Sequence, residues 1–193
     1  MAAAITAFES VTLDGVMQAP GRPDEDTRGG FPYGGWAVPY QDEVAMQFAG
    51  EGMSQGGALL FGRRTYDDLL GFWTTTPEPN PFTEVLVGTP KYVVSRNREL
   101  RLEHPNSTLL AGDATETVAE LRETLDGGIT VLGSGELVRA LLGAGLVDRL
   151  VLMQHPLVLG TGTTLFGPAR VELELQRSVP TTTGVIIAQY AVR

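Results

Sequence analysis

The chain contains no cysteine, few basic residues and no long apolar run. Without cysteine it cannot form a disulfide, a thiolate metal site or a cysteine nucleophile. Its 14 basic residues against 23 acidic ones give a formal net charge of −9, which argues against nonspecific binding to nucleic acid or to an anionic membrane. No segment approaches the length of a membrane span, and the first residues lack the basic and apolar regions of a secretion signal. We therefore expect a soluble protein of the cytoplasm.

The length and the order of the sequence patterns predict one α/β domain over residues 1–193. Strands are expected at 5–13, 58–61, 91–95, 108–111, 129–132, 147–154, 171–179 and 184–192, and helices at 41–55, 65–72, 115–125 and 136–142. The prolines within 74–81 predict a loop, and residues 180–183 a turn between the last two strands. This alternation predicts a mostly parallel central sheet with helices on both faces and a C-terminal antiparallel hairpin.

A glycine and two arginines follow the apolar strand expected at 58–61. Gly62 lets the backbone approach a ligand, and the amides at the start of the next helix are free donors that favour an anion. Arg63 and Arg64 add forked donors that suit phosphate oxygens, and Thr65 can donate a hydroxyl or cap the helix. The segment indicates a phosphate site, although an ordinary strand-to-helix turn with solvated arginines has the same pattern.

Polar and glycine residues also follow two other expected strands. They are Ser95 and Arg96 at the end of the strand at 91–95, and Gly133, Ser134, Gly135 and Glu136 after the strand at 129–132. Because ligands lie beyond the carboxyl ends of parallel strands, we expect all three segments to meet, although each alone is compatible with a plain turn. Glycines at helix N-termini suit a pyrophosphate, and arginine with a hydroxyl suits a further monophosphate. The combination favours NADPH over NADH as the ligand.

The order of the motifs along the chain resembles that of a known enzyme family. The matching segments are Thr12-Leu13-Asp14-Gly15, Gly62-Arg63-Arg64-Thr65-Tyr66, Tyr92-Val93-Val94-Ser95-Arg96, Gly133-Ser134-Gly135, Gly145-Leu146-Val147-Asp148 and Pro156-Leu157-Val158-Leu159-Gly160-Thr161-Gly162. They are similar to the reductase domain of bifunctional riboflavin-biosynthesis proteins, in the dihydrofolate-reductase-like superfamily. The resemblance covers nearly the whole chain and implies a three-layer dihydrofolate-reductase-like fold that binds NADPH, as a stand-alone domain and often a homodimer. The family's deaminase half, which would need a cluster of zinc ligands, is missing.

The resemblance also assigns cofactor contacts by position. The phosphates and ribose fall on Gly62, Arg63, Arg64 and Thr65, the 2′-phosphate on Ser95 and Arg96, and the pyrophosphate on Gly133, Ser134, Gly135, Glu136 and Leu137. The nicotinamide would be bordered by Val16 and by the late segment with Leu159, Gly160 and Gly162. That late segment is equally compatible with a glycine-rich loop ahead of the hairpin.

The identity of the substrate is less evident in the sequence. Dihydrofolate reductases carry a carboxylate on the first helix that would fall on or near Met46, whereas the nearest acids, Asp42 and Glu43, lie a turn earlier. This departure argues against folate reduction, and the chain also lacks a basic set for the ribityl phosphate of the riboflavin intermediate. We expect a small heterocyclic, carbonyl or imine substrate that takes hydride from the cofactor.

A few residues are candidates for contact with this small molecule. They are Asp14, Trp36, Tyr40, Phe72 and His155. The aspartate ends the first strand and could orient the substrate or relay a proton, or simply form a turn with the next glycine. The aromatic residues could belong to a mobile lid or to a dimer contact, and the histidine could line the pocket or make a structural hydrogen bond.

Two other function classes fit the same motifs. The chain could be a non-catalytic module that binds NADPH as a sensor or a scaffold. It could also be an enzyme that processes a nucleotide or a phosphosugar through the same anion sites. A preference for NADPH over NADH would separate a reductase from this last class.

Overall fold

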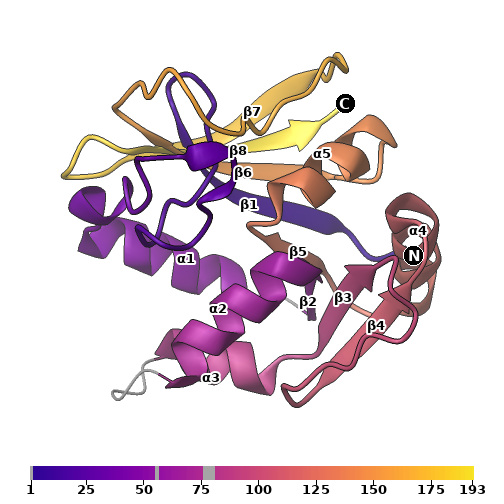
Figure 1. Ribbon diagram of the computed structural model, residues 1–193. Helices are drawn as coiled ribbons and strands as arrows, with labels where there is room; N and C mark the ends of the chain where they lie inside the picture. Colours follow the sequence, from indigo (N-terminus) through magenta and orange to yellow (C-terminus); the bar gives the residue numbers. More distant parts are fainter. Residues whose placement is uncertain (1, 55–56, 76–80) are drawn as a thin grey trace.

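The structure is a computed structural model that describes residues 2–54, 57–75 and 81–193. Within these ranges, eight strands form one sheet in the order β4-β3-β2-β5-β1-β6-β8-β7 (Figure 1). The strands are β1 (Ile5–Thr12), β2 (Ala58–Gly62), β3 (Lys91–Ser95), β4 (Ser107–Ala111), β5 (Ile129–Leu132), β6 (Arg149–His155), β7 (Leu173–Pro180) and β8 (Ile186–Val192). Neighbouring strands from β4 to β6 are parallel, and β8 runs antiparallel to β6 and β7. The predicted sheet and C-terminal hairpin are confirmed.

Helices cover both faces of the sheet (Figure 1). They are α1 (Glu43–Ser54), α2 (Arg63–Thr75), α3 (Pro81–Gly88), α4 (Ala114–Thr124) and α5 (Gly135–Gly143). Side chains alternate along β2, so that Leu59 and Phe61 pack with α2 and α3, whereas Leu60 packs with α4 and α5. Helix α1 covers β6 and β8 on the same side as α2. The predicted three-layer arrangement is therefore confirmed.

The proline-containing region differs from its prediction. Helix α2 continues to Thr75 and α3 begins at Pro81, where the sequence predicts a loop over 74–81, and the rest of that segment lies outside the described residues. Proline is tolerated in the first turn of a helix, because the N–H that it lacks would have no partner within the helix. Phe82 and Leu86 of α3 pack into the cluster beneath α2, and this apolar spacing stabilises a helix that the prolines concealed.

The other helices and strands begin and end within two residues of their predicted bounds, except that Gln55, the predicted end of the first helix, lies outside the described residues. None of the helices in the described ranges is long and apolar enough to cross a membrane.

The segment at 17–40 forms a long connection between β1 and α1 that contains two short 3-10 helices, Arg28–Gly30 and Val38–Tyr40. Gln18 holds this insert in place from its beginning. Its side-chain nitrogen donates to the carbonyls of Asp26 and Arg28, and its side-chain oxygen accepts from the Thr163 N–H at 2.9 Å. The first half of the insert is therefore fixed beside the carboxyl end of β1.

Candidate active site

A cavity of about 1650 Å³ extends along the sheet to the carboxyl ends of its central strands. Helix α2 begins directly after β2, and α5 begins after a two-residue turn that follows β5. Every residue predicted to contact phosphate or ribose lines this cavity: Gly62, Arg63, Arg64, Thr65, Ser95, Arg96, Gly133, Ser134, Gly135, Glu136 and Leu137. The structure thus brings together the three segments that the sequence predicts to meet, and their binding role stays a prediction.

The turns that lead into α2 and α5 are joined by a hydrogen bond. The Gly62 N–H donates to the Ser134 hydroxyl oxygen at 3.0 Å. Gly133 and Ser134 have positive φ angles of 53° and 62°, a conformation that glycine adopts readily and serine seldom. Because both helices begin here, their free N–H groups and positive dipole ends lie at one place in the cavity, where an anion is favoured.

Glycine is required at the start of α5 for steric reasons. A Cβ atom added to Gly135 would overlap the sulfur of Met17 from the insert, so the side chain of Met17 lies directly against this turn. The unbranched thioether of methionine adapts its shape more easily than a branched side chain. Met17 is therefore the part of the insert that covers the α5 turn.

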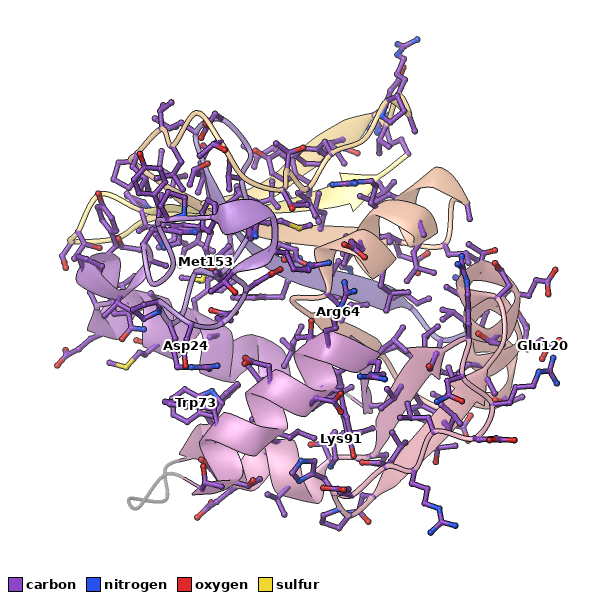
Figure 2. The ribbon with its side chains drawn as sticks, in the orientation of Figure 1. Asp24, Arg64, Trp73, Lys91, Glu120 and Met153 are labelled. Carbon is purple, nitrogen blue, oxygen red and sulfur yellow. The ribbon has the colours of Figure 1, made fainter. Side chains whose placement is uncertain are left out.

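Two arginines and one glutamate connect the insert with both helix N-termini. Arg28 of the insert lies 3.0 Å from the Glu136 carboxylate of α5, and Arg64 of α2 lies 3.9 Å from the same carboxylate. Figure 2 shows Arg64 at the start of α2, facing α5. Arg63 instead pairs with Asp67, one turn further along its own helix, at 3.3 Å. The charges at the rim are thus partly compensated within the protein.

Ser95 and Arg96 lie at the end of β3, on the far side of β2 from β5. Arg96 is exposed. Asp113, the N-cap of α4, has a lowered pKa, because Thr115 and nearby backbone N–H groups donate hydrogen bonds to its carboxylate and, to a smaller extent, because Arg96 is positively charged. Arg96 therefore faces both the cavity and a nearby carboxylate.

Asp14 lies outside the group of residues that line the cavity. Its carboxylate accepts hydrogen bonds from the Thr12 hydroxyl at 2.5 Å and from the N–H groups of Leu159 and Gly160 at 3.2 and 2.7 Å. These bonds lower the pKa of Asp14, led by the one from Thr12. The contacts are those of a clamp that joins the end of β1 to the late glycine segment, and a part in proton transfer stays a prediction.

Val16 and Gly160, both predicted to border the nicotinamide, also lie outside the cavity lining. Val16 is buried and forms a bridge with Thr164, and its N–H donates to the Thr12 hydroxyl. Gly160 is exposed and binds the carboxylate of Asp14. Their neighbours Met17, Gln18 and Thr163 do line the cavity, so the two segments border it through other residues.

The aromatic residues predicted to contact the substrate do not line the cavity either. The Trp36 ring lies edge-on to His155 with centroids 5.0 Å apart, and Tyr40 packs against the same imidazole at 5.7 Å. Burial lowers the pKa of His155, whose Nδ1 lies 2.9 Å from the Met153 carbonyl oxygen. This cluster anchors the second half of the insert to β6.

Phe72 is exposed and packs under the Arg22 guanidinium, 4.5 Å from its ring centroid. The adjacent Trp73 lines the cavity in its place, together with Phe8 of β1 and Phe48 of α1. Successive helical side chains point about 100° apart, which explains why one aromatic residue of the pair faces the cavity and the other does not. The sequence alone could not show which side of α2 points toward the cavity.

Glu9 is a buried acid in the cavity lining that the sequence does not single out. Glu9 on β1 is 4 % exposed, and its Oε1 atom has no hydrogen-bond partner among the residues that the structure describes. Burial raises the pKa of Glu9 to about 8. The signal was present in the strand pattern, because Glu9 occupies an inward position between the apolar residues Ala7 and Val11. Over the described part of the chain, no group of three or more acidic or histidine side chains is arranged to hold a metal ion.

The sequence comparisons and the structure comparisons with known proteins point to the same kind of protein. The family described as the RibD C-terminal domain matches residues 3–187. The uncharacterized protein YyaP of Bacillus subtilis is 30% identical over 190 residues, which cover 94% of this chain and 90% of that protein. A pyrimidine reductase-like protein of Corynebacterium diphtheriae has a similar structure, with a TM-score of 0.66, 13% identity and coverage of 99% of this chain and 92% of the other.

Two further solved structures share the fold. A deaminase/reductase of Thermotoga maritima has a TM-score of 0.67 at 13% identity, and the match covers 100% of this chain but 57% of that one. Dihydrofolate reductase from Enterococcus faecalis, complexed with NADP(H), has a TM-score of 0.61 at 18% identity, with 98% of this chain and 96% of that one covered. These likenesses establish the dihydrofolate-reductase-like fold.

Proposed function

The chain belongs to the RibD C-terminal domain family, and we propose that it is a reductase that transfers hydride from NADPH to a small uncharged heterocycle, carbonyl or imine. The observation that carries this proposal is the convergence of three strand ends, with two helix N-termini and several arginines, on one cavity. A structural neighbour, dihydrofolate reductase from Enterococcus faecalis, was solved with NADP(H), which supports the same cofactor here.

The joined turns before α2 and α5 are suited to the pyrophosphate. Backbone N–H groups of both helices would donate to its oxygens, and Arg63 and Arg64 would add charged donors. Glu136 would repel a phosphate at this place if its charge were uncompensated. Its 3.0 Å pair with Arg28 offsets that charge, whereas the 3.9 Å separation from Arg64 leaves the second arginine able to turn toward a phosphate.

Ser95 and Arg96 are suited to the 2′-phosphate that distinguishes NADPH from NADH. A hydroxyl and a guanidinium at the end of one strand can donate to the same monophosphate, and both residues line the cavity. The nearby Asp113 would disfavour a ligand that brings more negative charge without binding Arg96 directly. The proposal therefore assigns the choice of cofactor mainly to Arg96.

The remaining part of the cavity is suited to a flat, uncharged substrate. Its floor includes Phe8 and Ser10 of β1, and its walls include Phe48 of α1 and Trp73 of α2. Aromatic walls of this kind favour planar rings. Because the phosphate-binding turns and this aromatic region belong to one cavity, the substrate and the reactive end of the cofactor can meet within it.

Acidic residues line the cavity near its aromatic walls. Asp24, Glu25 and Asp68 line the cavity there, and Figure 2 shows Asp24 and Trp73 toward the same end of α2. Arg22 pairs with Asp68 and lies 3.4 Å from Asp24, so two carboxylates share one guanidinium. The net negative charge beside Asp24 and Asp68 disfavours phosphorylated or carboxylate-bearing substrates at that end of the cavity. Positive charge lies instead beside Phe48, where Arg177 is 5.0 Å from the ring centroid.

NADPH supplies the hydride when bound, and the chain's own residues would orient the two reactants and exclude water. The first half of the insert, from Met17 to Arg28, borders the cavity and would form part of that cover. The Gln18 hydrogen bonds and the Arg28 pair with Glu136 hold it against the body of the domain.

The proposal is tested by titrating the purified protein with NADPH and with NADH while following nicotinamide fluorescence. We expect NADPH to bind at least tenfold more tightly, because a charged hydrogen bond is worth about 1.5–3 kcal/mol. Arg96→Ala should remove most of this preference by weakening NADPH binding and leaving NADH binding unchanged. Arg98→Ala is the matched control, since Arg98 is exposed on the same loop but does not line the cavity.

Binding of neither nucleotide would refute the proposal. Unchanged preference in Arg96→Ala would show that the 2′-phosphate lies elsewhere. If NADPH binds tightly, a screen of uncharged imines, ketones and heterocycles for NADPH oxidation follows, and turnover of at least one of them is expected. Tight binding without turnover across such a screen would favour the sensor or scaffold class.

A further inference from the structure

Glu9 is a buried acid on a central strand of the sheet, and its Oε1 atom has no hydrogen-bond partner within the part of the chain that the structure describes. It lies on the face of β1 that packs toward α5, between Ala7 and Val11, which both belong to the apolar cluster beneath α4 and α5. The side chain is 4 % exposed, and across the described ranges its Oε1 atom meets no hydrogen-bond donor. A buried polar atom without a hydrogen-bond partner destabilises a fold, unless a bound ligand supplies that partner.

Other acids around the cavity are satisfied within the protein. The Glu25 carboxylate accepts from the N–H groups of Gly21 and Arg22, and the Glu136 carboxylate pairs with Arg28. Glu9 lines the same cavity, and among the described residues its Oε1 atom has neither kind of partner. Burial keeps it protonated near neutral pH, since its pKa is raised to about 8. A neutral carboxylic acid presents one O–H donor and one carbonyl acceptor side by side.

The order of the strands determines which part of a dinucleotide would come near Glu9. The two helix N-termini suited to the pyrophosphate follow β2 and β5, which are neighbours in the sheet. Arg96 follows β3, beyond β2 on one side, and β1 lies beyond β5 on the other. A dinucleotide whose 2′-phosphate reaches Arg96 therefore extends its other end, the nicotinamide, toward β1.

The surroundings of Glu9 match an uncharged ring that carries an amide. Met17 and Leu137 line the cavity on the α5 side and pack with the apolar cluster that contains Ala7 and Val11. A primary carboxamide places one of its two N–H donors beside its carbonyl acceptor, in the same spacing as the groups of a carboxylic acid, so the two can form a pair of hydrogen bonds. In an apolar environment such a pair of hydrogen bonds contributes more to the binding free energy than it would in water.

We propose that Glu9 binds the carboxamide of the nicotinamide ring and thereby positions the reactive end of the cofactor. The inference rests on the proposed function, because it requires that NADPH occupies the cavity. It assigns to Glu9 a binding interaction that a carboxamide-free nucleotide cannot make. Met17, which lies against the α5 turn, is the flexible side chain that makes room for the ring.

The test compares two nucleotides with the same phosphates. NADPH and 2′-phospho-ADP-ribose, which lacks nicotinamide, are titrated into wild type, Glu9→Leu and Glu9→Gln, with calorimetry as the readout. Glu9→Leu is expected to weaken NADPH at least tenfold and to leave 2′-phospho-ADP-ribose within about twofold. Glu9→Gln is expected to stay within about threefold for both, because a glutamine amide can make the same pair of bonds. Glu120→Leu, on the outer face of α4, is the control (Figure 2).

Equal NADPH affinity in wild type and Glu9→Leu would overturn the inference while the proposed function stands. Weaker binding of both nucleotides to Glu9→Leu would also overturn it, because the residue would then maintain the cavity as a whole. If Glu9→Leu does not fold, the wild type still provides a test with the reduced acetylpyridine analogue of NADPH, which has a ketone in place of the amide. It should bind about tenfold more weakly, and equal affinity would overturn the inference. If wild type binds neither NADPH nor 2′-phospho-ADP-ribose, the proposed function itself is refuted.

Discussion

Glu9→Gln is expected to abolish a loss of stability that the wild-type protein undergoes between about pH 4.5 and pH 8. Burial raises the pKa of Glu9 from its ordinary value of 4.5 to about 8. The folded protein therefore holds a proton that the unfolded chain releases in this range. The contribution of Glu9 is fully present below pH 4.5, and it is lost progressively until the pH passes 8. Above that value both states are ionised and the difference is constant.

The size of the effect follows from the same two values. Each tenfold change in proton affinity is worth about 1.4 kcal/mol, so the interval from 4.5 to about 8 corresponds to about 5 kcal/mol in total. Part of the loss falls outside an accessible experimental range. Between pH 5 and pH 8, the free energy of unfolding of wild type should fall by about 3.5 kcal/mol relative to that of Glu9→Gln.

Urea unfolding followed by tryptophan fluorescence at pH 5, 6, 7 and 8 measures this difference. Glutamine has nearly the same shape as glutamate and does not titrate, so groups other than Glu9 contribute equally to both curves. Glu120→Gln, at an exposed position on α4, should run parallel to wild type throughout. Parallel curves for wild type and Glu9→Gln would refute the reasoning, because they would mean that Glu9 is ionised or hydrated in the folded protein.

Three further predictions concern Gly135 in the cavity lining and Asp14 and His155 outside it. Gly135→Ala should destabilise the protein by about 1–3 kcal/mol, because its Cβ overlaps Met17, and the double variant with Met17→Ala should recover most of this loss in urea unfolding. Asp14→Asn should lower the thermal unfolding midpoint less at acidic pH than at pH 7. The reason is that the pKa of Asp14 is lowered in the folded protein, so its stabilising contribution is lost as the pH falls. The affinity for NADPH should not change. The lowered pKa of buried His155 should make the wild type less stable as the pH falls below 6.5, with a change in Trp36 fluorescence that His155→Gln removes.

Each of these has an outcome that contradicts it. If the Gly135→Ala and Met17→Ala double variant is no more stable than Gly135→Ala alone, the added methyl group destabilises the protein through the backbone and not through Met17. A large loss of NADPH affinity in Asp14→Asn would indicate that the aspartate takes part in cofactor binding. A wild-type fluorescence that stays constant between pH 7 and pH 5 would mean that the contact of His155 with Trp36 does not respond to protonation.

Most of the fold could be predicted from the sequence because its signals are local. Alternation of apolar residues, glycines after strands and caps before helices are all set within a few residues of one another. The turns proposed to bind phosphate are recognised by the same class of signal, since Gly62 and Gly133 directly follow predicted strands. The second helix of the proline region, α3, was missed because proline in a first helical turn and proline in a loop are indistinguishable without the packing of Phe82.

The substrate side of the cavity could not be predicted in the same way. Whether Phe72 or Trp73 faces the cavity depends on the rotation of α2 about its axis, which is set by the side chains it packs against. Whether Asp14 acts as a clamp depends on the late glycine segment, 145 residues further along the chain, which brings the Leu159 N–H to its carboxylate. These outcomes depend on contacts between distant segments, which no local pattern records.

The sequence by itself determined the layered α/β arrangement and the positions of the glycine- and arginine-containing turns after the strands, because these follow from periodicity and residue type. Only the tertiary structure decided that all three turns open into one cavity and that Arg28 compensates Glu136. It alone also decided that Glu9 is buried beside them, with no partner for its Oε1 atom in residues 2–54, 57–75 and 81–193. The physical reason is that burial and charge compensation are properties of a place in space, and several distant segments must fold together before that place exists.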